Sequence, residues 1–190
     1  DVASQHWMER ATDWAAKDIP NDKLVLGLAS YGYDWSSDGD CNTVSYEQAL
    51  ANAYGTGAGI DFDDDSYNVG YSYYDDDNNL HKVSFTDAAT TFNNMRFGTT
   101  YHLAGFALWR LGTEDSRVWN FYGKDMSWEQ VKRWNLNNLF ALNGYSDVNY
   151  VGSGEVLDVE SEPHPGRVAV SVDSDDELVS EEKYITLPSA

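Results

Sequence analysis

The 190 residues are enough for one domain of ordinary size, and a hydrophobic content of 42% is enough for a packed core. The chain carries 32 acidic and 12 basic residues, a net charge of −20, which argues against nucleic acid, anionic membranes and strongly anionic substrates because these partners need Lys/Arg patches. The acids are spread along the whole chain, so we interpret them as a general surface property. Cys41 is the single cysteine, which excludes a disulfide framework and a Cys-based metal site.

The first part of the chain has an α/β pattern. Residues 4–18 predict a helix, with Trp7, Ala11 and Trp14 on one face, and Pro20 lies just beyond its end. Residues 23–28 then form a continuous apolar run, which is typical of a strand buried on both faces of a parallel sheet or barrel. A second such run at 104–109 predicts that the same frame returns later in the chain.

Between these two runs, residues of about 36–103 predict a small α+β insertion. A polar loop is expected at 36–42, and Ser45 with Gln48 forms a capping box that opens a short helix. The remaining expected elements are strands at 59–62, 70–74 and 80–85 and a helix at 86–97. Further on, we expect a helix from Ser127 to about 142, a Pro-containing linker, and strands at 167–172 and 178–185.

Sequence motifs do not predict a self-contained active site. Asp61-x-Asp63-x-Asp65 begins like a calcium loop, but Ser66 replaces the required Gly and Ser72 the required Glu, so a solvated turn is the favoured interpretation. The four His are scattered without metal-binding spacing, and no His lies near Cys41 in the sequence. We therefore predict no metal site, no cofactor and no catalytic residue within this chain.

Aromatic residues are more abundant than a plain core needs. The chain has seven Trp and thirteen Tyr. Flat rings stack on the C–H faces of pyranose sugars, so a surplus of rings suits a sugar-binding protein. The alternative is that most of these rings simply fill the core.

Two segments resemble the last two strands of the barrel in glycoside hydrolase family 18, the chitinase-like family. The segment Lys23-Leu-Val-Leu-Gly-Leu-Ala-Ser-Tyr-Gly-Tyr-Asp-Trp35 is similar to strand seven, and Gly105-Phe-Ala-Leu-Trp109 is similar to strand eight. Family members often carry a small α+β insertion between these strands. The resemblance implies the C-terminal portion of a (β/α)8 TIM barrel, with an α+β insertion and a C-terminal β extension.

The family's catalytic motif, D-x-x-D-x-D-x-E on strand four, does not occur in the sequence, and we expect it upstream of residue 1 in a longer protein. Its Glu acts with the N-acetyl group of the substrate as nucleophile. The resemblance implies that Trp109 forms the floor of the sugar site and that Tyr31, Tyr33 and Trp35 contact substrate at the C-terminal end of a barrel strand. The alternative for Trp109 is a barrel-core role.

The tail segments at 148–157 and 167–188 resemble the connection between a family 18 domain and a polysaccharide deacetylase domain, in proteins that also carry a glycosyltransferase. The domain organisation expected from this is the end of the barrel at 1–122, a final helix and linker at 123–162, and a β extension at 163–190 that leads to a following domain.

The resemblance implies that the parent protein hydrolyses or binds a β-linked N-acetylglucosamine polysaccharide, with this chain inactive alone. The alternatives are a non-catalytic glycan-binding module that serves a neighbouring deacetylase or glycosyltransferase, and a structural domain without a ligand. Expected partners are an oligosaccharide or polysaccharide, and either the missing N-terminal part or a second copy of the chain. We expect no membrane insertion by this chain and an extracytoplasmic parent protein.

Overall fold

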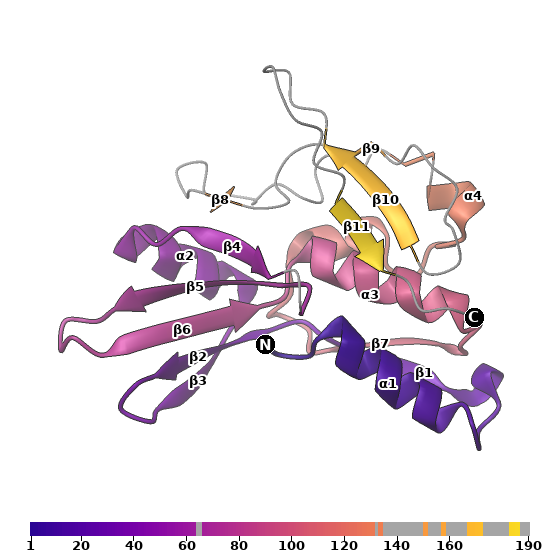
Figure 1. Cartoon of the computed structure of the whole chain (residues 1–190), viewed down its shortest axis with the longest axis horizontal. Helices are drawn as coiled ribbons and strands as arrows, with labels where there is room; N and C mark the ends of the chain where they lie inside the picture. Colours follow the sequence, from indigo (N-terminus) through magenta and orange to yellow (C-terminus); the bar gives the residue numbers. More distant parts are fainter. Residues whose placement is uncertain are drawn as a thin grey trace.

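The computed structural model describes residues 1–63, 66–131, 133–134 and four short strands in the remaining C-terminal part. Two groups of elements make up its N-terminal two thirds (Figure 1). One contains a pair of parallel strands with two helices, and the other is a larger, mostly antiparallel sheet with one helix.

The two apolar runs form neighbouring parallel strands, as the α/β pattern predicts. Strand β1 (Val25–Ala29) pairs with β7 (Gly105–Trp109) from Val25↔Gly105 to Ala29↔Trp109. Helix α1 (Gln5–Ala15) precedes β1, and helix α3 (Ala88–Thr100) precedes β7. The fold class is therefore α/β in this part, whereas the closed barrel stays a prediction.

Apolar side chains join this strand pair to α3 and to the 3-10 helix η2 (Ser116–Asn120). Phe92 of α3 packs edge-on against Phe121, with their ring centroids 5.5 Å apart. The other buried members of this core include Leu28, Met95 and Val118. Helix α3 thus packs on the strand pair and lies between its two strands in the chain.

Burial of both strand faces, which the apolar runs predict, is wrong for β1. Val25 is 58% exposed, and within the described part of the chain β1 pairs with β7 alone. Helix α1 also leaves Trp7 and Trp14 largely exposed and buries Met8 instead. The physical reason is that two strands cannot enclose a barrel interior, so one edge of β1 and the neighbouring aromatic side chains stay uncovered.

The larger sheet has six strands in the order β3-β2-β6-β5-β4-β8. Neighbouring strands in this sheet are antiparallel, except that β4 and β8 are parallel to each other. Helix α2 (Tyr46–Thr56) covers one face and begins with the predicted capping box of Ser45 and Gln48. The strands are β2 (Gly32–Ser36), β3 (Cys41–Val44), β4 (Ile60–Asp63), β5 (Asn68–Tyr74), β6 (Leu80–Phe85) and β8 (Tyr150–Val151).

The predicted polar loop at 36–42 is partly wrong, because β2 and β3 form a hairpin across it. The run from Lys23 to Trp35 also divides into two strands in different sheets. Ser30 ends β1 by bonding to the end of β7, and Gly32 then lets β2 approach β6 very closely. A Cβ atom at Gly32 would lie 2.4 Å from Cβ of Phe85.

The remaining elements are short. They are η1 (Asn21–Lys23), α4 (Trp128–Val131), and the antiparallel sheet of β9 (Leu157–Asp158), β10 (Arg167–Val172) and β11 (Lys183–Thr186). The predicted helix beyond residue 134 and most of the linker lie outside the described residues, and the domain boundaries stay predictions. None of the described helices combines the length and apolar character needed to cross a membrane.

Candidate functional site

Three of the four predicted sugar-contacting residues form a continuous row of rings along β2. The Tyr31 and Tyr33 rings meet edge to face at 5.4 Å between centroids, and the Tyr33 and Trp35 rings are also 5.4 Å apart. A side-chain hydrogen bond with Tyr33 is the main cause that raises the pKa of the Tyr31 phenol. We call these three residues the aromatic row.

The aromatic row lies on the sheet face opposite α2. Side chains alternate along a strand, and Asp34 pairs with Val83, which is buried in the core that α2 covers. Tyr33 and Trp35 must therefore point to the other face. Their cross-strand partners on β6 are Ser84 and Lys82, both polar, so this face is an accessible surface with rings set among polar groups.

Trp109 lies at the end of β7, beside the start of the aromatic row. Its side chain is 69% exposed, and its carbonyl accepts a hydrogen bond from the Ser30 amide at 2.8 Å. The Ser30 hydroxyl donates to the Arg110 carbonyl at 2.7 Å. The predicted residues thus lie at one end of the parallel pair, although the ring contacts of the described residues do not include Trp109. The Trp109–Arg110 peptide bond is cis.

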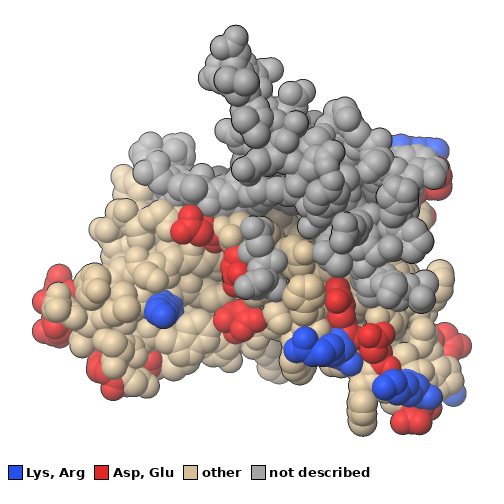
Figure 2. All heavy atoms as spheres, viewed as in Figure 1, with Lys and Arg blue, Asp and Glu red and all other residues tan. Residues whose placement is uncertain are grey.

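A hollow of about 720 Å³ continues from Trp35 across the open face of the sheet. Its lining combines a ring, hydroxyls, carboxylates and one ammonium, contributed by residues that include Trp35, Asp61, Ser72, Lys82 and Ser84. Gly70 of β5 also lines it. Acidic side chains are spread over the visible surface of the molecule, with few basic side chains among them (Figure 2). Such a surface offers hydrogen bonds to a neutral polar ligand and little attraction to an anionic one.

A buried polar cluster fixes the sheet against the parallel pair. Arg117 donates from Nε to Asp115 at 2.9 Å and from Nη2 to the Tyr46 hydroxyl at 3.1 Å. Asp115 also accepts the Ala88 amide at 3.0 Å, at the start of α3. The Tyr46 amide in turn donates to the Thr113 carbonyl at 2.9 Å. These bonds join α2, α3 and the segment after Trp109, so they set where the aromatic row stands relative to Trp109.

A second polar cluster lies behind the aromatic row and was not predicted from the sequence. Asp34 of β2, Tyr73 of β5 and His81 of β6 meet on the α2 face of the sheet. The alternation of side chains along each strand decides which face of the sheet each residue occupies. The cross-strand register that brings the three residues together depends on the lengths of the hairpins. The predicted site residues show no comparable network of charged groups.

The described residues contain no group of three or more His, Cys, Asp or Glu placed to hold a metal ion. The Asp61-x-Asp63 pair lies on β4, where both carboxylates face the hollow side, and Asp63 accepts a hydrogen bond from Ser66 Oγ at 2.6 Å. Asp65 lies outside the described residues.

Comparison with known sequences places this geometry in a family context. Residues 2–114, more than half of the chain, match the family described as glycosyl hydrolases family 18. An uncharacterized glycosylase, YvbX, of Bacillus subtilis is 27% identical over 120 residues, covering 62% of this chain and 35% of its own length. The cortical fragment-lytic enzyme of the same organism is 29% identical over 112 residues, covering 56% of this chain and 26% of its own length. The chain thus spans only about a third or less of these relatives.

Solved structures give the same result. A chitinase from Chromobacterium violaceum has a TM-score of 0.59 at 28% identity, over 62% of this chain and 37% of that one. The spore cortex-lytic enzyme SleL from Bacillus megaterium has a TM-score of 0.56 at 25% identity, over 63% of this chain and 30% of that one. With the family match over residues 2–114, the chain belongs to glycosyl hydrolase family 18.

Proposed function

We propose that this chain supplies part of the glycan-binding surface of a family 18 glycosidase that acts on a β-linked N-acetylglucosamine polysaccharide. The observation that carries the proposal is the aromatic row of Tyr31, Tyr33 and Trp35, which leads from the exposed Trp109 to the hollow on the open sheet face. The names of the similar proteins, a chitinase and two cortex-lytic enzymes, support a glycan as ligand.

The chemistry of this surface fits a neutral amphipathic sugar. A pyranose ring has apolar C–H faces and a polar rim, so it stacks on an exposed ring while its hydroxyl and acetamido groups reach neighbouring donors and acceptors. Trp109 offers a largely exposed ring at the end of β7, and Ser72, Lys82 and Ser84 offer polar groups beyond Trp35. Several sugar units in sequence would be bound along this path.

Catalysis in the whole protein would use a Glu outside this chain, because family 18 enzymes use one acid together with the substrate's own N-acetyl group. On this account the chain alone binds glycan and does not hydrolyse it. The same surface also suits a second function, that of a non-catalytic module. The presence of a Glu at the end of strand four in the full-length protein decides between them.

The uncovered edge of β1 supports a proposal about the partner of this chain. Trp7, Met8 and Ala11 of α1 and Leu26 of β1 line a hollow of about 320 Å³ beside this edge. Open strand edges and exposed apolar faces favour association. We propose that the other strands of the barrel cover this edge in the full-length protein, and that a second copy covers it in the isolated chain. An extracytoplasmic location and fusion to a deacetylase and a glycosyltransferase remain proposals that rest on the tail resemblance.

The test is titration of the chain with N-acetylglucosamine oligomers, followed by intrinsic Trp fluorescence. The matched variants are Trp109→Ala and Trp14→Ala, because both side chains are 69% exposed in the structure. We expect Trp109→Ala to weaken binding about fivefold or more, by analogy with the loss of about 1–3 kcal/mol when an aromatic ring that stacks on a nucleic base is removed, and Trp14→Ala to leave it unchanged. Equal affinities for the wild type and the Trp109 variant would refute the proposed sugar contact.

A further inference from the structure

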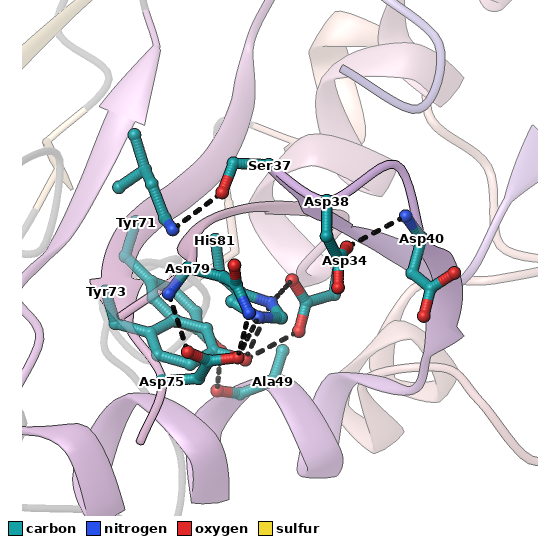
Figure 3. Close-up of polar contacts among 11 residues, drawn as sticks. Asp34, Ser37, Asp38, Asp40, Ala49, Tyr71, Tyr73, Asp75, Asn79 and His81 are labelled. Atoms are coloured by element: carbon teal, nitrogen blue, oxygen red, sulfur yellow. Dashed lines mark hydrogen bonds and ion pairs between the residues drawn. The ribbon is translucent and has the colours of Figure 1, made fainter. Parts of the chain in front are cut away.

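His81 lies between two carboxylates on the α2 face of the sheet (Figure 3). Its Nδ1 is 2.8 Å from Oδ1 of Asp34, and its Nε2 is 3.4 Å from Oδ2 of Asp75. The Tyr73 ring stacks on the imidazole at 4.6 Å between centroids, and its hydroxyl donates to Oδ2 of Asp34 at 2.8 Å. The side chains of His81 and Asp34 are only 15% and 11% exposed. This is a built cluster rather than a chance surface pair.

The cluster is directly behind the aromatic row. Asp34 stands between Tyr33 and Trp35 on β2, and because side chains alternate, its carboxylate points away from their rings. His81 belongs to β6 and Asp75 to the turn between β5 and β6. The cluster therefore ties the strand that carries the two rings to the far end of the neighbouring hairpin.

His81 bridges the carboxylates of Asp34 and Asp75, and this bridge depends on the proton at Nε2. An imidazolium donates from both nitrogens, one to each carboxylate. A neutral ring protonated at Nδ1 keeps the bond to Asp34, but it directs a lone pair from Nε2 at the Asp75 carboxylate. The hydrogen bond with Asp34, and then the weaker one with Asp75, raise the pKa of His81 above 6.5, against the opposing effect of burial.

The groups around His81 come from every neighbouring element. Asp38, in the turn after β2, is negatively charged and interacts with His81, and its side chain accepts the Asp40 amide at 3.1 Å. From the other side, α2 contributes the uncharged amide of Asn52, which lies near the β5 phenols. The titratable groups that face the cluster are thus Asp34, Asp38, Tyr71, Tyr73 and Asp75. Three carboxylates around one imidazole favour its protonated form.

We propose that His81 is a positioning residue for glycan binding, because its bridge between Asp34 and Asp75 fixes β2 and, through it, the rings of Tyr33 and Trp35. This inference rests on the proposed function. Glycan binds more tightly to the chain with His81 protonated, so the affinity is highest below the pKa of His81 in the free folded chain. That pKa is raised above 6.5 by the hydrogen bond with Asp34, and the affinity falls as pH rises through it.

The test uses nuclear magnetic resonance on the 190-residue chain, following the His81 ring and the Trp35 indole N–H from about pH 5.5 to about pH 8.5. We expect the Trp35 signal to move with the midpoint of His81. The dissociation constant for an N-acetylglucosamine oligomer should rise about threefold over the same range, and saturating oligomer should raise the pKa of His81 by about half a unit, because the coupling is reciprocal.

Two variants separate positioning from a structural role. In His81→Asn the amide still donates toward Asp34 but carries no titrating proton, so the affinity should become independent of pH. In Asp75→Asn one carboxylate is removed, so the midpoints of His81 and of the affinity profile should both move to lower pH. The control is His102→Asn, because His102 is an exposed residue with a positive φ of 53°, a conformation that Asn tolerates. This variant should keep the wild-type profile.

The outcomes are distinct. A Trp35 signal that stays constant while His81 titrates overturns the inference, as does an unchanged pH profile in His81→Asn. If His81→Asn does not fold, the midpoint shift in Asp75→Asn decides. If the wild type binds no oligomer but Trp35 still follows His81, the coupling stands and the proposed glycan function fails.

Discussion

The Ser30 amide donates to the Trp109 carbonyl at 2.8 Å, and this bond joins the ends of the two parallel strands. It extends the ladder of β1 and β7 by one step beyond the Ala29↔Trp109 pair. The next residue, Tyr31, begins the aromatic row that continues into a different sheet. This backbone bond therefore lies at the point where the strand pair meets the insertion sheet.

Replacing Arg117 by Leu should strongly destabilise the chain. Asp115 is 1% exposed and would keep a buried charge without its cation. Removal of one partner from a buried ion pair costs about 3–5 kcal/mol. Chemical denaturation measures the loss, and Arg110→Leu, at an exposed arginine, is the control that should change the free energy of unfolding little. A cost below about 1 kcal/mol for Arg117→Leu would mean that the cluster does not hold the sheet against the strand pair.

The sequence predicted which segments form the strands at this junction better than it predicted which strands pair with each other. The apolar runs at 23–28 and 104–109 predicted β1 and β7, because continuous Val, Leu and Ala residues suit a strand in a parallel sheet. The capping box at Ser45 predicted the start of α2 for a local reason, since both of its bonds are within one turn. Local signals of this kind are present in the sequence itself.

Long-range register was not predictable. The break at Ser30 and Tyr31 depends on bonds to β7, about 80 residues away, and on the close approach at Gly32. In the candidate site, too, the contacts that depend on long-range strand pairing were not predictable. Tyr31, Tyr33 and Trp35 were predicted from the family resemblance, whereas the cluster of Asp34 with His81 needs the pairing of β2 with β6.

Substitution of Gly32 by Ala should cost about 1–3 kcal/mol, the usual penalty for overpacking. A Cβ atom there would lie 2.4 Å from Phe85 Cβ and 2.7 Å from the Ser84 carbonyl oxygen, so β2 and β6 would have to separate. Gly27→Ala is the matched control within a strand, since nothing lies within 4 Å of its added Cβ. Thermal unfolding of the two variants distinguishes them, and equal melting temperatures would contradict the close approach of β2 and β6.

Asp87 should make the chain less stable as pH rises above 3.8. It is a buried N-cap of α3 that accepts the Thr90 amide at 2.7 Å, and burial raises its pKa above the ordinary value of 3.8. The folded state then holds the proton more tightly than the unfolded state, so the free energy of unfolding falls between 3.8 and the raised value.

The Asp87→Asn variant tests this directly. An asparagine keeps the cap and removes the titration, so this variant should be more stable than the wild type at neutral pH and should lose less stability between acidic and neutral pH. Denaturant unfolding as a function of pH is the measurement, with Asp18→Asn at an exposed position as the control. A wild type that gains stability over this interval, relative to the variant, would show that Asp87 is held ionised.

The most direct test of the central claim is a map of the indole N–H signals of the seven Trp residues on addition of an N-acetylglucosamine oligomer. The account predicts saturable shifts at Trp109 and Trp35, with a common dissociation constant, and no shift at the exposed Trp7 and Trp14 of α1. Shifts confined to Trp7 and Trp14, or no shift at millimolar oligomer in the folded chain, would contradict it and would leave the aromatic row without a role in glycan binding.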